Sequence, residues 1–136
     1  MQITYSDNKD EINVNELKCL FQRVANWKMP SDINDWIDMN NFTPLLIVAL
    51  SDNKIIGFAR VLTDFVRWGE IYDVVVDEEY QGRGIGTELV KRIINHSKVS
   101  RVRTFSLGAS NGKGDFYKKL GFQKVNDLGG KVDLNF

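Results

Sequence analysis

The chain has 136 residues, enough for one domain with one hydrophobic core and too few for two. Apolar residues make up 43% of it and charged residues 26%, as in ordinary soluble globular domains. The 18 lysines and arginines balance the 18 aspartates and glutamates, which argues against a general binder of nucleic acid or other polyanions. We therefore expect a single domain over residues 1–136 and no nucleic-acid partner.

Nothing in the sequence is typical of secretion or membrane insertion. Residues 1–12 lack the apolar core of a signal peptide, and the longest apolar runs have the length of a strand, not of a membrane span. Cys19 is the only cysteine, so no internal disulfide can form, and a single cysteine with a single histidine is too few for a structural zinc site. We expect a cytoplasmic protein with no membrane partner and no metal.

The first third of the chain predicts an edge strand followed by two helices. Residues 2–5 alternate in polarity like a short strand, and residues 15–25 place apolar side chains on one helical stripe. A break follows at Pro30, after which Ser31 is expected to cap a second, short helix. Pro44 ends that segment.

The middle of the chain predicts a hairpin, a further strand and the strongest helix. Residues 45–50 and 55–62 read as strands joined by the polar turn 51–54. Residues 68–76 form the next strand, and its end, a run of three valines, indicates burial on both faces. Residues 84–97 follow as an amphipathic helix.

The last third predicts a strand at 102–107, a helix at 114–120 and strands at 122–125 and 131–134. With the earlier elements, this order favours an α+β sandwich. We expect a central mixed, mostly antiparallel sheet of six to seven strands flanked by about four helices.

The loop at residues 81–87, between the strand 68–76 and the following helix, has the features of an anion site. It contains Gly82, Gly84 and Gly86, and glycine permits positive φ and close approach of a ligand to the backbone. The first N–H groups of a helix lack internal partners, and the helix dipole adds about half a positive charge there, which suits a phosphate. A plain glycine-rich connector is the alternative, but three glycines cost roughly 1 kcal/mol each where they are helical.

Two common phosphate-binding patterns do not fit this loop. Thr87 stands where a G-x-G-x-x-G fingerprint needs its last glycine, so a dinucleotide-binding Rossmann site is not favoured. The G-x-x-x-x-G-K-[ST] pattern of a P-loop is missing as well.

At these residues the chain resembles the GNAT superfamily of N-acetyltransferases. The family's Gln/Arg-x-x-Gly-x-Gly/Ala signature is matched from Gln81 to Gly86, and its aromatic-Tyr pair before Leu-Gly-Phe is matched at residues 116–122. The match covers roughly residues 45–126, and the order of elements extends it to the whole chain. In the Asn-x-x-Ala run of many members, Asn111 is displaced by one position and Lys113 replaces a small residue.

The resemblance implies a CoA-binding acetyltransferase that moves an acetyl group from acetyl-CoA to a primary amine, by direct attack in a ternary complex. It implies that the Val74 N–H binds the acetyl carbonyl, that the Val76 N–H and C=O bind the pantetheine arm like an added strand, and that Tyr117 is the general acid. Arg83 and Lys119 are candidates for phosphate contacts, with a solvated surface charge as the alternative. The cofactor-binding residues implied are Val74, Val76, Gln81, Gly82, Arg83, Gly84, Ile85, Gly86, Thr87, Asn111, Phe116, Tyr117 and Lys119.

A base is also needed, because an amine of pKa about 10.4 must lose a proton, at a cost of roughly 4.6 kcal/mol at pH 7. The resemblance makes Glu70 the first candidate. Asp73 is the second, and strand alternation predicts that it points to the face opposite Glu70. The alternative for both carboxylates is solvation or a salt bridge to Arg60 or Arg67.

The acceptor is left open between a small amine, an amino sugar and a protein amino group. We expect an acidic acceptor groove, with Trp27 and Trp36 either as its walls or as core residues. A catalytically silent CoA-binding sensor or interaction module, a nucleotide-binding protein of other chemistry, and a homodimer also stay open. The acidic residues expected around the groove are Asp35, Asp38, Asp64, Glu70 and Asp73.

Overall fold

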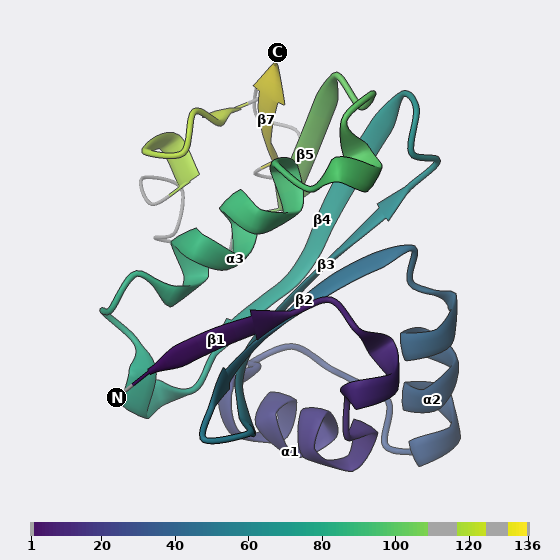
Figure 1. Cartoon of the computed structure of the whole chain (residues 1–136), viewed down its shortest axis with the longest axis vertical. Coiled ribbons are helices and arrows are strands. Elements are labelled where there is room, and N and C mark those ends of the chain that lie inside the picture. Colours follow the sequence, from purple (N-terminus) through teal and green to yellow (C-terminus); the bar gives the residue numbers. More distant parts are fainter. Residues whose placement is uncertain (1, 109–116, 125–130, 136) are drawn as a thin grey trace.

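The computed structural model describes residues 2–108, 117–124 and 131–135, which form a layered α+β fold (Figure 1). One seven-stranded sheet runs through them in the order β1-β2-β3-β4-β5-β7-β6, and every neighbouring pair is antiparallel except β4 and β5. The sheet is therefore mixed and mostly antiparallel, as expected. The strands are β1 (Ile3–Ser6), β2 (Leu45–Ser51), β3 (Lys54–Thr63), β4 (Trp68–Val76), β5 (Thr104–Gly108), β6 (Gln123–Lys124) and β7 (Lys131–Asn135).

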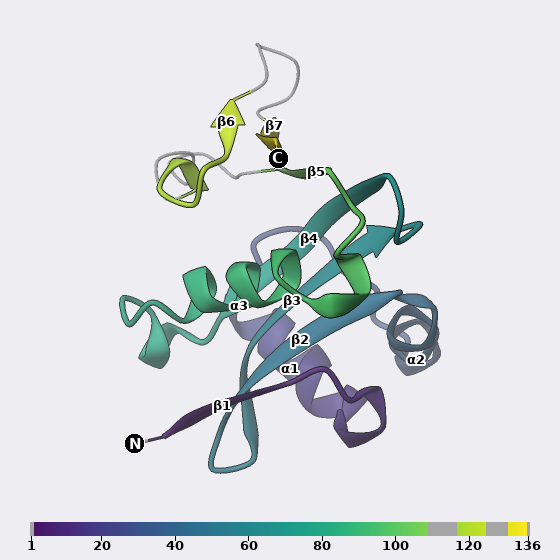
Figure 2. The same cartoon turned by 45° about the horizontal axis from the view of Figure 1, so that its top comes forward.

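Three α-helices of the described part of the chain cover the sheet: α1 (Val14–Val24) and α2 (Ile33–Phe42) on one face, and α3 (Ile85–Ile94) on the other, as the two views in Figures 1 and 2 show. Three 3₁₀ turns join them to the strands, at Lys9–Glu11, Glu78–Tyr80 and Ser97–Val99. Of the helix expected at 114–120, residues 114–116 lie outside the described residues, and in the described part Tyr117 and Lys118 are helical.

The helix boundaries correct two sequence predictions. The cap of α2 is Asp32, whose carboxylate accepts a hydrogen bond from the Asn34 N–H at 2.9 Å, and not Ser31. Helix α3 ends at Ile94 instead of residue 97. A separate 3₁₀ turn follows at Ser97–Val99, and the His96 side chain caps it by accepting from the Lys98 N–H. Polar side chains that bond to nearby amides thus set both boundaries.

The strand predictions hold with small shifts at their ends. β4 begins and ends where the sequence predicts it, at residues 68 and 76. β5 starts at Thr104, two residues late, because the Val102 N–H bonds back to the Val99 C=O in a turn. Of the strand predicted at 122–125, the structure shows residues 123 and 124, and Val125 lies outside the described residues.

Two apolar layers hold the fold together, one on each face of the sheet. Residues of β2, β3, β4 and β5 pack against α3, while others of β2 and β3 pack against α1 and α2. Trp36 lies within the second layer, edge-on to Phe21 with ring centroids 5.1 Å apart, and its Nε1 donates to the Pro30 carbonyl at 2.8 Å. Trp36 is therefore a core residue and not a wall of a groove.

A β-bulge interrupts β4 at Asp73. Phe58 pairs with Val75 and Arg60 pairs with Tyr72, so Asp73 and Val74 together oppose the single residue Ala59. Asp73 has φ +58°, a left-handed conformation that suits a bulge. The extra residue resets the alternation of side chains along the strand.

The bulge overturns the prediction that Asp73 points away from the face that carries Glu70. The Asp73 carboxylate accepts from Arg60 Nε at 2.8 Å, and the same guanidinium lies 6.0 Å from the ring centroid of Tyr72. Glu70 and Tyr72 share a face because they are two residues apart before the bulge. Glu70, Tyr72 and Asp73 therefore lie on one side of the sheet, where β4 passes the end of α2.

Gly69 permits the close pairing of β4 with β5, because a Cβ there would lie 2.7 Å from the ring of its neighbour Phe105. We expect Gly69→Ala to lower the free energy of unfolding by about 1–3 kcal/mol, since the buried Phe105 must shift. Gly108→Ala is the control, because a Cβ there meets no atom of the described residues within 4 Å, and it should change the value by less than about 0.5 kcal/mol. Urea unfolding of both variants measures the difference, and equal stabilities would contradict the packing role of Gly69.

Candidate active site

A cleft of about 840 Å³ opens where β4 and β5 part. Their pairing ends at Ile71 and Leu107, although β4 continues for five more residues, and β5 lies beside only the upper part of β4 in Figure 1. The lining residues come from β4, the loop before α3, the segment after α1, and β5. They are Val24, Asn26, Trp27, Glu70, Ile71, Tyr72, Asp73, Val74, Val75, Val76, Tyr80, Gln81, Gly82, Gly84, Ile85, Gly86, Leu107, Gly108 and Tyr117.

The backbone amides of Val74 and Val76 face this cleft. The Asp77 N–H donates to the Ile56 carbonyl of β3 at 2.8 Å, and amide directions alternate along a strand. The amides of Val76 and Val74 therefore point to the other edge of β4, the edge that β5 leaves after Ile71. Both residues line the cleft, as the family resemblance implies.

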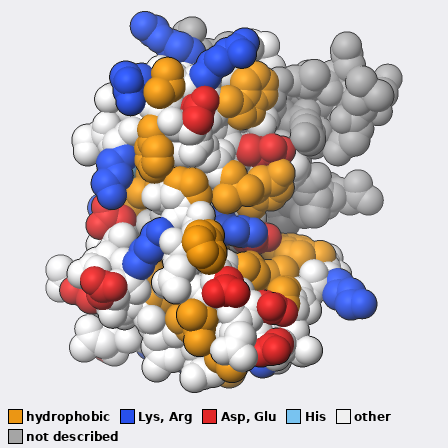
Figure 3. Space-filling model, turned by 90° about the vertical axis from the view of Figure 1, so that its right-hand side faces the viewer, with side chains coloured by type: hydrophobic (Ala, Val, Ile, Leu, Met, Phe, Trp, Pro, Cys, Tyr) orange, Lys and Arg blue, Asp and Glu red, His pale blue; other side chains and the backbone are white. Residues whose placement is uncertain are grey.

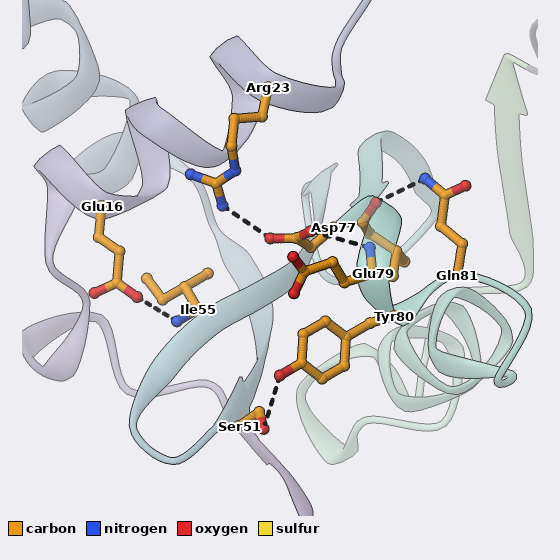
Figure 4. A network of polar contacts seen from close by, with 9 residues as sticks. Glu16, Arg23, Ser51, Ile55, Asp77, Glu79, Tyr80 and Gln81 are labelled. Atoms are coloured by element: carbon orange, nitrogen blue, oxygen red, sulfur yellow. Dashed lines mark hydrogen bonds and ion pairs between the residues drawn. The ribbon is translucent and has the colours of Figure 1, made fainter.

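The Val76 carbonyl already has one partner within the chain. Gln81 Nε2 donates to it at 2.9 Å, which folds the Gln81 side chain back onto the end of β4 (Figure 4). A carbonyl oxygen has two lone pairs, so one position for a second donor is left. Gln81 was predicted to bind the cofactor, but its hydrogen bond to the end of β4 was not predicted.

The glycine loop presents backbone groups to the same cleft. Gly82 and Gly84 have φ of +79° and +80°, and a Cβ built on either would meet nothing within 4 Å. Gly84 is the N-cap of α3 and, having no side chain, leaves the first amides of the helix without a side-chain cap. Open space in front of uncapped amides at the positive end of a helix suits an anion.

The structure brings most of the predicted cofactor residues into the cleft and leaves a few outside it. Arg83, Thr87 and Lys119 are absent from the lining within the described residues, and the Arg83 guanidinium instead lies 5.2 Å from the ring centroid of Tyr80. Asn111 and Phe116 fall outside the described residues. Their expected contacts stay predictions.

Tyr117 lies on the wall of the cleft, with 8% of its surface exposed. Its ring meets Phe122 edge-on, with centroids 6.2 Å apart. Burial raises the pKa of the Tyr117 phenol above its ordinary value of 10.0, because the charged phenolate is poorly solvated there. The group is therefore a neutral phenol at physiological pH.

Only two of the five carboxylates expected around an acceptor groove line the cleft, Glu70 and Asp73. The Asp73 carboxylate is paired with Arg60, the salt-bridge alternative of the sequence analysis. Asp64 caps its own turn by accepting from the N–H groups of Val66 and Arg67. Acidic side chains do gather on the lower half of the face seen in Figure 3, but Asp35 and Asp38 of α2 do not line the cleft.

Aromatic residues form much of the remaining wall. Trp27, weighed from the sequence as a wall or a core residue, lines the cleft and is exposed. Tyr72 and Tyr80 line it too, and the sequence analysis singled out neither. Tyr72 lies between the two candidate bases in the sequence, and Tyr80 directly precedes the glycine loop. These positions could have indicated that both residues line the site.

An ion pair joins the segment just before the glycine loop to the part of the cleft wall that follows α1. Arg23, in the last turn of α1, donates to the Asp77 carboxylate at 2.9 Å, and Asp77 also accepts from the Glu79 N–H at 3.2 Å (Figure 4). Tyr80 adds a bond to Ser51 Oγ at 3.3 Å. The segment that carries Val24 and Trp27 is thus anchored to the chain just before the glycine loop.

The Asp77 side chain is 10% exposed and that of Arg23 46%, so we expect a coupling energy of about 1 kcal/mol between them. A double-mutant cycle with Arg23→Ala and Asp77→Ala, followed by urea unfolding, measures it. The pair Arg92–Glu88, 3.4 Å apart and exposed on both sides, is the control and should give about 0.3 kcal/mol. Equal couplings at the two pairs would contradict the anchoring role.

The described residues hold neither a metal-binding cluster nor a membrane-spanning helix. They contain no group of three or more histidine, cysteine, aspartate or glutamate side chains that could hold a metal ion. No helix among them is long and apolar enough to cross a membrane.

Comparisons with known proteins agree with this geometry. Residues 11–122 match the model of the acetyltransferase (GNAT) family. An uncharacterized N-acetyltransferase, ycf52, from Pyropia yezoensis is 32% identical over 127 residues, which cover 92% of this chain and 72% of that protein.

Two solved structures share the fold at low sequence identity. A putative GNAT acetyltransferase from Xanthomonas campestris has a TM-score of 0.80 at 22% identity, covering 93% of this chain and 87% of its own. A GNAT acetyltransferase from Elizabethkingia anophelis, solved with acetyl-CoA bound, has a TM-score of 0.73 at 21% identity over 98% of both chains. Together with the family match, the parted strands and the uncapped helix show that this chain belongs to the GNAT family of acetyltransferases.

Proposed function

We propose that this chain transfers the acetyl group of acetyl-CoA to a primary amine by direct attack, with both substrates bound at once. The observation that carries the proposal is that the uncapped start of α3 and the open edge of β4 face one cleft, with Tyr117 on its wall. Acetyl-CoA bound to the Elizabethkingia relative supports the choice of cosubstrate. The single cysteine suits a reducing compartment, and we propose the cytoplasm.

The glycine loop would hold the pyrophosphate of the cosubstrate. The amides of Ile85, Gly86 and Thr87 follow the Gly84 cap and have no acceptor one turn back in the helix, so they supply donors together with the helix dipole. The β4 edge at Val76 would take the pantetheine arm in the manner of an added strand. Asn111, Phe116 and Lys119 complete the contacts that we propose from the resemblance.

Acetyl-CoA supplies a thioester, whose carbonyl carbon the amine attacks. The Val74 N–H would donate to the carbonyl oxygen, where negative charge develops as the C–N bond forms. Tyr117 would give its phenolic proton to the sulfur as the C–S bond breaks. Because the pKa of Tyr117 is raised, the phenol carries that proton throughout the neutral range.

Glu70 is the better of the two candidates for the base. The resemblance makes Glu70 the first candidate, and the Asp73 carboxylate is engaged with Arg60 at 2.8 Å. Glu70 lines the same cleft, three residues before Asp73 and on the same face of β4. We therefore propose that it takes the amine proton through water. The neutral amine then attacks, and the second proton that its nitrogen loses on becoming an amide returns to the Tyr117 phenolate, which restores the phenol.

Replacing Glu70 with Gln should lower kcat by about 10²-fold and remove a limb from the pH–rate profile, while acetyl-CoA affinity stays within about twofold. Asp73→Asn is the matched control on the same strand and should lower kcat much less. Steady-state rates across pH, with calorimetry for acetyl-CoA, separate the two effects. Unchanged turnover in the Glu70 variant would reject its role.

Tyr117→Phe tests the general acid with little change of shape, since the ring contact with Phe122 is retained. We expect kcat to fall by about 10²-fold with acetyl-CoA affinity and melting temperature nearly unchanged. Any loss of the wild-type rate from phenol ionisation should begin at a higher pH than for a solvent-exposed tyrosine, because burial raises the pKa of Tyr117. Acetyl-CoA binding by the wild type without turnover of any amine would instead indicate a CoA-binding sensor.

A further inference from the structure

An exposed apolar surface continues from the acceptor end of the cleft across the sheet. Leu62 of β3 and Trp68 and Tyr72 of β4 are 41%, 46% and 38% exposed, although all three are large and apolar or aromatic. We call these three side chains together with Glu70, which lies on the same face, the outer patch. Exposed groups of this kind mark a place where another molecule binds more often than single scattered side chains do.

The sheet register places the outer patch on one face. Leu62 lies directly opposite Glu70, and Glu70 lies opposite Ser106 of β5. Trp68 Nε1 donates to Ser106 Oγ at 3.2 Å, which fixes the indole over that row. Tyr72 follows two residues after Glu70 and so points the same way.

The helices that cover this face stop short of the outer patch. Phe58 of β3 is covered by Phe21 of α1, with ring centroids 5.6 Å apart. Arg60, two residues later, bonds to Thr43 at the end of α2. Leu62, two residues further, lies beyond both helices and is exposed.

The outer patch is continuous with the cleft and much longer than a small amine. Glu70 and Tyr72 belong to both, and the Val74 N–H lies at the far end of the same strand. At about 3.3 Å per residue, Val74 and Trp68 are roughly 20 Å apart along β4. An acceptor with its amine near Val74 reaches Trp68 only if it is an extended molecule, about six residues of polypeptide.

We propose that the acceptor is an amino group of a polypeptide, and that apolar side chains beside that amino group bind the outer patch. This deepens the proposed function and rests on it. Tryptophan and tyrosine are the residues that contribute most often at protein-binding surfaces, and leucine adds apolar area. A polyamine of similar length has no apolar side chain to contact Leu62, and a small amine would leave the patch unused.

Two peptides of about ten residues test the proposal, each with a free N-terminus and one central lysine. One has leucine and phenylalanine beside the amino groups, and the other has serine at those positions. We expect the wild type to acetylate the apolar peptide with a kcat/KM about tenfold higher than that of the serine peptide. Mass spectrometry of the products shows which amino group reacts.

Leu62→Ser and Trp68→Ser should each lower kcat/KM for the apolar peptide about three- to tenfold. The kcat/KM for n-butylamine, which is too short to reach either side chain, should stay within about twofold of the wild-type value. Ile37→Ser is the matched control, since Ile37 of α2 is equally exposed but belongs neither to the patch nor to the lining of the cleft within the described residues, and it should change the kcat/KM of neither substrate. If Trp68→Ser lowers the melting temperature, Leu62→Ser alone carries the comparison.

Equal rates for the two peptides, or equal losses for peptide and n-butylamine in both variants, would overturn the proposal while the acetyltransferase function stands. A wild-type dimer that Trp68→Ser converts to monomer in sedimentation, with the peptide preference unchanged, would also overturn it by assigning the patch to a second copy. Acetyl-CoA binding with no turnover of either peptide or n-butylamine would mean that the proposed function itself fails.

Discussion

The early end of the β4–β5 ladder is the constraint on which the site depends. Parallel pairing stops at Ile71 and Leu107, so the last five residues of β4 stay paired with β3 through Tyr72, Val75 and Val76 and turn a second edge toward open space. The bulge at Asp73 works on the same stretch, because one extra residue on β4 changes which side chains and amides face that space. A regular ladder would have used those amides to bind β5 and left no room for a ligand.

Around this opening, backbone groups without side chains line the places where a ligand comes closest, and hydrogen bonds between side chains hold the walls of the cleft in position. The positive φ of Gly82 and Gly84 brings the loop to the cleft without side chains in the way. Behind the loop, the largely buried Asp77 carboxylate accepts from Arg23 of α1 and from the Glu79 N–H of its own turn (Figure 4). The Asp77 backbone N–H donates to the Ile56 carbonyl of β3, so three elements meet at one residue. Its arrangement is typical of a binding loop held by a rigid support.

The sequence predicted the strand–loop–helix unit well because its signals are local. The valine run, the glycines and the amphipathic stripe of α3 each lie within a few residues, and β4 was placed to the residue. The bulge was missed because it depends on how β3 pairs with β4, which no local pattern records. For the same reason Asp73 was assigned to the wrong face, and Arg23, Tyr72 and Tyr80 could not be connected to a site that forms only when distant segments meet.

The hydrogen bond from Gln81 to the Val76 carbonyl has a thermodynamic consequence for any molecule that lies along β4. An arriving amide that competes for this oxygen exchanges one hydrogen bond for another, and such exchanges change the free energy little. Affinity at that edge must then come from the phosphate end and from apolar contacts, while the backbone mainly sets alignment. The Gln81 side-chain amide also keeps the Val76 carbonyl oxygen hydrogen-bonded when no ligand is bound along β4.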